Sequence, residues 1–183
     1  MNILMEKEIR FDKRDSAFEK EQKKIIKNCF KNIAEQNKEL KLDLSYFDSI
    51  SKGNGNKGVY INHEGFFTPV QIKRNRCKDS KALDGVGTYI NVTNGEIFEI
   101  YMFCKYTSQK GGTQDSILFE VGVTQNCISK CTNENFAVVF MLEGDYWTPS
   151  IIKDCEFDNV KSFYANRDTL EEIINNILNT NLL

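Results

Sequence analysis

The chain has 183 residues, of which 40% are hydrophobic and 27% are charged, and its formal net charge is −2. This length suits one compact domain with a substantial core and is short for two domains. The near-neutral charge excludes a strongly basic nucleic-acid-binding protein, so any contact with DNA has to come from a local basic patch. We therefore expect a single globular domain over residues 1–183.

The N-terminal sequence "MNILMEKEIR" carries charges where a secretory signal needs an apolar stretch. No apolar run reaches the roughly 18 residues that a membrane-spanning helix requires. The six cysteines form no CxxC pair and the chain has one histidine, which argues against a zinc site. We expect reduced, packed thiols in a cytoplasmic protein that has no membrane partner.

The first half of the chain begins with an amphipathic helix, predicted over residues 16–40 from the 3–4 spacing of its apolar residues. Lysines line its other side, either as a solvated face or as contacts to a phosphate backbone. These lysines are Lys20, Lys24, Lys27 and Lys31. After a polar loop over 41–57, the segments "GVYINHEG" and "FFTPVQIKRNRCK" predict two strands. The second ends in the densest basic cluster of the sequence: Lys73, Arg74, Arg76 and Lys78.

The next segments, "DGVGTYINV" and "EIFEIYMFCKY", predict two strands joined by "TNG". Asn-Gly is the strongest short hairpin signal, because both turn residues adopt positive φ. If Asn94 and Gly95 are the two turn residues, Asp84 lies directly opposite Lys105. Side-chain alternation then places Asp84, Phe103 and Lys105 on the same face of the sheet.

The second half of the chain predicts a helix from an N-cap at Thr113 to about Cys131, and then "FAVVFML", a strand buried on both faces. Pro149 suits the first turn of a short helix, and "VKSFYA" predicts the last strand. Thr169 and Glu172 form a capping box at the start of the final helix. The fold class is therefore α/β: a mixed sheet, made of an antiparallel meander and a buried strand, flanked by helices.

An acidic residue that starts one strand opposite a lysine that ends the next suits phosphodiester hydrolysis. The Asp84 carboxylate is a hard oxygen ligand for Mg²⁺, and the Lys105 ammonium can orient an attacking water or stabilise charge on a phosphoryl oxygen. The alternative interpretation is a cross-strand ion pair at the rim of the sheet.

These features resemble the PD-(D/E)XK nuclease superfamily, and within it the small type II restriction endonucleases. The resemblance rests on the order of elements, on Asp84 and Lys105, and on the segments "KYTSQKGGTQDS" and "AVVFMLEGDYWTPSIIK". It covers about residues 16–180 and implies a restriction-endonuclease-like fold with Mg²⁺-dependent cleavage of double-stranded DNA. Because cutting both strands usually needs two active sites, it also implies a homodimer.

One position departs from the family pattern, which has an acidic residue two positions before the lysine, where this chain has Phe103. Glu99 is roughly 20 Å along the strand from Lys105 and is a poor substitute. Some members of the superfamily take this carboxylate from the following helix, where Asp115 and Glu120 lie, and Glu120 is the favoured second metal ligand beside Asp84. The alternative function is a catalytically inactive nuclease-like domain that binds DNA or protein. A third is an unrelated domain that binds a small molecule or a protein.

The expected DNA contacts are basic and polar residues near this site. Lys73, Arg74 and Arg76 precede it by one short loop and suit contacts to phosphate. Gln114 opens the helix after Gly111 and Gly112, where backbone N–H groups attract anions. Alternatively, these glycines only permit a tight turn between strand and helix.

Overall fold

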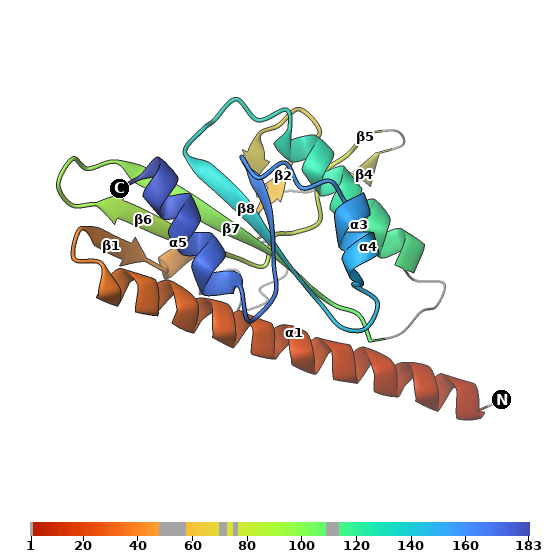
Figure 1. The fold of residues 1–183 in the computed structure, drawn as a ribbon. Helices are drawn as coiled ribbons and strands as arrows, with labels where there is room; N and C mark the ends of the chain where they lie inside the picture. Colours follow the sequence, from red (N-terminus) through yellow and green to blue (C-terminus); the bar gives the residue numbers. More distant parts are fainter. Residues whose placement is uncertain (1, 48–57, 70–72, 75–76, 109–113) are drawn as a thin grey trace.

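The computed structural model describes residues 2–47, 58–69, 73–74, 77–108 and 114–183. Its helices and strands form a mixed α/β arrangement, which confirms the predicted class (Figure 1). In chain order they are α1 (Asn2–Gln36), β1 (Leu40–Asp43), β2 (Tyr60–Ile61), β3 (Phe67–Thr68), β4 (Lys73–Arg74), β5 (Cys77–Lys78), β6 (Gly85–Asn91), β7 (Ile97–Tyr106), α3 (Gln114–Ile128), β8 (Phe136–Glu143), α4 (Pro149–Asp154), β9 (Ser162–Ala165) and α5 (Leu170–Asn181).

The main sheet has five strands in the order β1-β6-β7-β8-β9. Strands β1, β6 and β7 form an antiparallel meander, while β8 and β9 run parallel to β7. The predicted antiparallel pair of β6 and β7 and the predicted buried strand β8 are therefore confirmed. Strand β1 is not, because its residues were predicted as the end of a helix and the start of a loop. The single strand predicted over "FFTPVQIKRNRCK" is wrong, because β3 pairs with β2 and the basic part folds into a separate β4–β5 hairpin.

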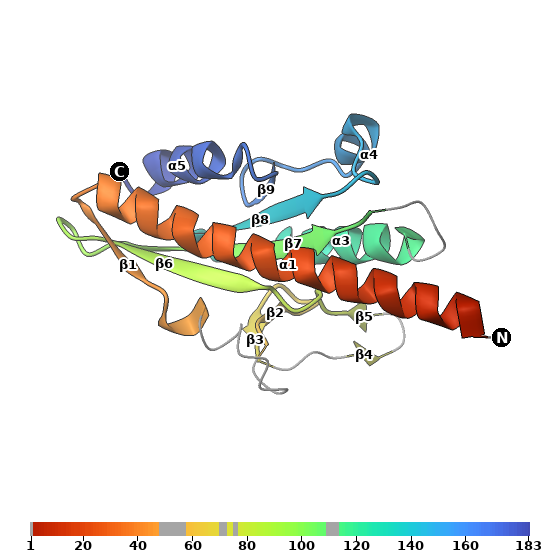
Figure 2. The same cartoon turned by 90° about the horizontal axis from the view of Figure 1, so that it is seen from below.

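Both faces of the sheet are covered by helices, with α1 and α5 on one face and α3 and α4 on the other (Figure 1, Figure 2). Alternating residues of β7 and β8 supply the two cores: Met102 packs with α1 and α5, and Phe103 packs in the core under α3. Strand β8 is consequently buried from Phe136 to Leu142, as its continuous apolar sequence predicts.

The β6–β7 hairpin has a register different from the predicted one. Gly85 faces Met102, so the strands are displaced by two residues and Asp84 falls in line with Phe103, not with Lys105. The reason is a loop of four residues, 92–95, in place of a two-residue turn. The Asn91 side chain holds this loop: its Oδ1 accepts from the backbone N–H of Thr93 at 2.8 Å and its Nδ2 donates to the Leu182 carbonyl at 2.8 Å.

Local sequence patterns predict some of the helix ends correctly and others not. Thr148 caps α4 by accepting from the Ile151 N–H at 3.4 Å, with Pro149 in the first turn, as predicted. The capping box at Thr169 is wrong: this residue makes no cap bond from its side chain, and its hydroxyl accepts from the Asn166 N–H at 3.1 Å. The predicted cap at Thr113 lies outside the described residues. Among the helices that the structure describes, none has the length and apolarity to cross a membrane.

Candidate functional site

The predicted site lies at the end of the sheet where β7 and β8 finish. Because these strands are parallel, their last residues, Tyr106 and Glu143, are neighbours. Strand β6 runs antiparallel to β7, so Asp84, one residue before β6, lies at the same end. The β4–β5 hairpin also lies toward this end of the molecule (Figure 2). In open α/β sheets, ligands bind outside the carboxyl ends of the strands.

The Asp84 carboxylate is paired with cations of the chain itself. Its Oδ2 accepts from the Cys104 N–H at 2.9 Å and from Lys81 Nζ at 3.2 Å. Its Oδ1 lies 3.4 Å from Lys23 Nζ on α1, and the Asp84 side chain is only 15% exposed. Both oxygens are therefore engaged, and the carboxylate connects the start of β6 to β7 and to α1.

Lys81 makes two further contacts at this site. Its Nζ donates to the Cys104 carbonyl at 3.0 Å and lies 4.8 Å from the centre of the Phe103 ring. The Phe103 ring is fully buried and packs against Phe140 with centroids 5.0 Å apart. The position at which the nuclease pattern has a metal ligand is therefore part of the apolar core.

Among the described residues, no hydrogen bond or ion pair joins Asp84 to Lys105 or to Glu120. Lys105 is half-buried near the end of β7, beside Leu142 of β8 and two residues beyond the position that aligns with Asp84. Glu120 lies on α3, and its Oε2 is buried with no hydrogen-bond partner among the described atoms. Gln114 and Asp115 open α3, but their side chains lie outside the described part.

The predicted DNA contacts are placed by their backbone only. Lys73 and Arg74 form β4, with Lys73 facing Lys78 across the hairpin. Their side chains and the whole of Arg76 lie outside the described part. Of the sequence cluster, the backbones of Lys73, Arg74 and Lys78 are thus brought together by the pairing of β4 and β5.

A metal site does not fit the described residues. Within them, no three His, Cys, Asp or Glu side chains are grouped so that they could hold a metal ion. Mg²⁺ needs oxygen ligands in near-octahedral geometry, whereas each oxygen of Asp84 already contacts an ammonium group. The predicted Mg²⁺ pair of Asp84 and Glu120 therefore stays a prediction that this geometry does not support.

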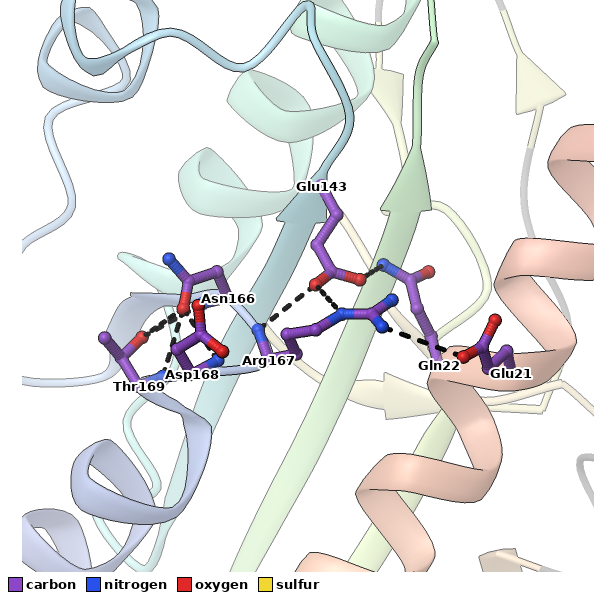
Figure 3. Close-up of polar contacts among 7 residues, drawn as sticks. All are labelled: Glu21, Gln22, Glu143, Asn166, Arg167, Asp168 and Thr169. Carbon is purple, nitrogen blue, oxygen red and sulfur yellow. Dashed lines mark hydrogen bonds and ion pairs between the residues drawn. The ribbon is translucent and has the colours of Figure 1, made fainter.

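A second polar cluster surrounds Glu143 at the end of β8 (Figure 3). Glu143 Oε1 accepts from the backbone N–H of Arg167 at 3.1 Å and from its Nε at 3.0 Å, while Oε2 accepts from Gln22 Nε2 at 2.9 Å. The hydrogen bond to Glu143 raises the pKa of the Arg167 guanidinium. Through these hydrogen bonds, Glu143 connects the end of β8 to α1 and to the segment before α5.

Sequence reasoning missed Lys23, Lys81, Glu143 and Arg167. Lys81 gave the best signal, since it lies three residues before Asp84. Glu143 is the first charged residue after the apolar run of β8. Lys23 and Arg167 gave no local signal, because their partners are distant in sequence.

The fold and the site define a mixed α/β domain with a lysine-paired carboxylate at the carboxyl end of its sheet. Comparisons with protein-family models, with curated proteins and with solved structures find no significant match to this chain. Function is therefore inferred from the geometry of the site.

Proposed function

We propose that this chain is a nuclease-like domain that binds double-stranded DNA without cleaving it by a metal-dependent route. The order of elements supports the restriction-endonuclease-like architecture: a helix, an antiparallel meander, a helix and a parallel buried strand. The observation that carries the proposal is the Asp84 carboxylate, both oxygens of which lie within 3.4 Å of a lysine ammonium.

This pairing opposes metal-dependent hydrolysis for an electrostatic reason. A divalent ion bound to Asp84 would lie close to the ammonium groups of Lys23 and Lys81, and like charges at such distances repel strongly in a partly buried site. A second carboxylate beside the ion would offset that repulsion, but Phe103 occupies the position that would supply it.

DNA is the proposed partner because basic residues gather in two places. One is the pair of β4 and β5, in which Lys73 faces Lys78 and Arg74 faces Cys77. On α1, the exposed side chains of Lys20, Lys24 and Lys31 recur at helical spacing on one side. They span about 16 Å of helix, a length over which several phosphates of one duplex can be contacted.

The binding test is the affinity for a short DNA duplex, measured by fluorescence anisotropy over a range of salt concentrations. Replacing Lys20, Lys24 and Lys31 together by alanine should weaken binding and reduce the salt slope by about one unit per lost phosphate contact. Arg74→Ala with Arg76→Ala should act similarly. Lys41→Ala, an exposed lysine on the edge strand β1, is the matched control and should change neither quantity.

The cleavage test separates this proposal from the endonuclease that the resemblance implies. We expect no nicking of supercoiled plasmid by the wild-type chain in Mg²⁺ or Mn²⁺. Metal-dependent cleavage that disappears in Asp84→Asn and in Lys105→Ala would overturn the proposal and establish the endonuclease. Glu120→Gln and Asp115→Asn would then identify the second carboxylate, and sedimentation would test the predicted homodimer.

A further inference from the structure

Three groups at the Asp84 site converge on one cation. Lys81 Nζ lies 3.2 Å from Asp84 Oδ2, 3.0 Å from the Cys104 carbonyl oxygen and 4.8 Å from the centre of the Phe103 ring. A carboxylate oxygen, a carbonyl oxygen and an aromatic face are all electron-rich, and each attracts positive charge. The site is thus built around a cation, and the chain supplies that cation itself.

We infer that Lys81 is a built-in cation that closes this site to divalent metals, and that removing its charge opens a Mn²⁺ site at Asp84. This inference rests on the proposed function, since it gives the reason for the expected lack of metal-dependent cleavage. The Asp84 Oδ2 and Cys104 carbonyl oxygens both lie within hydrogen-bonding distance of Lys81 Nζ. Hard divalent cations bind to oxygen ligands of this kind. The ammonium occupies the position between these two oxygens and repels a second cation.

Phe103 fits the same interpretation. An aromatic ring stabilises an ammonium group above its face, but it offers no oxygen to a metal ion. The ring is fully buried and cannot turn away from the site without opening the core. Lys81 and Phe103 therefore form a matched pair: the lysine takes the place of the metal, and the ring replaces an acidic ligand.

Lys23 provides the internal comparison. It carries the same charge and contacts the same carboxylate, but it reaches Oδ1 from α1 at 3.4 Å, on the other oxygen from Lys81. Removing the charge of Lys23 alters the local field and leaves the position between Asp84 Oδ2 and the Cys104 carbonyl filled. A general effect of one positive charge near the carboxylate would appear in both lysine variants, whereas an effect of a charge held between Asp84 Oδ2 and the Cys104 carbonyl would appear only in the Lys81 variants.

The experiment measures Mn²⁺ binding by the loss of the free-ion signal in electron paramagnetic resonance, on the full chain. Lys81→Met should bind Mn²⁺ about tenfold or more tightly than the wild type, because a unit charge is removed from the site. Lys81→Met combined with Phe103→Glu should bind more tightly still. Lys23→Met should bind as weakly as the wild type, and adding Asp84→Asn to Lys81→Met should abolish the gain.

Lys81→Gln serves as a second variant in case Lys81→Met does not fold. The glutamine amide can still donate to the Asp84 and Cys104 oxygens, but it carries no charge. Lys81→Gln should also gain Mn²⁺ binding. The inference is overturned if folded Lys81→Gln and Lys81→Met bind Mn²⁺ no better than Lys23→Met. It is also overturned if the wild type already binds Mn²⁺ in a manner lost in Asp84→Asn. DNA affinity is measured separately without metal, so a wild type that fails to bind DNA overturns the proposed function and leaves the Mn²⁺ comparison intact.

Discussion

Replacing Asp84 by asparagine tests whether this carboxylate stabilises the fold or is held there for chemistry. The change keeps an acceptor for the Cys104 N–H at 2.9 Å but removes the charge that pairs with Lys81 at 3.2 Å and Lys23 at 3.4 Å. Hydrogen bonds to charged groups each contribute about 1.5–3 kcal/mol, and partly exposed ion pairs contribute less. The two lysine side chains are 23% and 30% exposed, so we expect a loss of about 2–4 kcal/mol in the free energy of unfolding.

The assay is urea unfolding followed by the fluorescence of Trp147, which is the only tryptophan and is buried. Thermal melting should show a midpoint lower by roughly 5–15 °C. Asp43→Asn, at an exposed carboxylate on β1, is the control and should change stability much less. An Asp84→Asn variant as stable as the wild type, or more stable, would refute the reasoning, because active-site charges are commonly kept at a cost in stability.

Phe103→Ala should lower the free energy of unfolding by about 3–5 kcal/mol in urea, because the ring is fully buried, and Phe103→Leu should cost less. Gly144→Ala should cost more than about 3 kcal/mol in thermal melts, since φ is 105° and an added Cβ would clash with the backbone carbonyl of Thr107. Gly95→Ala, with φ 77° and open space around it, should cost about 1 kcal/mol. Burial opposes ionisation of Asp158, but N–H groups of residues 160–162 outweigh it and lower its pKa. That stabilisation is present above about pH 4 and is lost as pH falls through the lowered pKa, so Asp158→Asn should flatten acid unfolding curves.

The elements with strong local patterns could be predicted from sequence. The continuous apolar run of β8 predicts a buried strand, and the spacing of apolar residues in α5 predicts an amphipathic helix. Each prediction needs only the sequence of that one segment. The β6–β7 register could not be predicted in the same way. It depends on the Asn91 amide, which binds the loop on one side and Leu182 on the other, and the second partner is visible only in the folded chain.

The residues of the candidate site also differ in whether the sequence predicts their role. Asp84 and Lys105 stand out because a charge at the end of an apolar strand is conspicuous in sequence. Lys23 and Lys81 do not stand out among the many lysines of the chain, yet they decide what the Asp84 carboxylate binds. Their role follows from the packing of α1 across the sheet, which no local pattern encodes.

The packing of α1 also has a consequence for the order of folding. Its apolar residues Ile26, Phe30 and Ile33 share one core with Ile174 and Ile177 of α5. During synthesis α1 is made before α5, so until α5 is present the apolar residues of α1 can be covered only by the sheet, for example through the contact of Phe30 with Tyr89. Compact states that lack α5 therefore leave part of this core exposed, and exposed apolar surface favours aggregation. We expect the core on this face of the sheet to close only when α5 docks against α1 and the sheet.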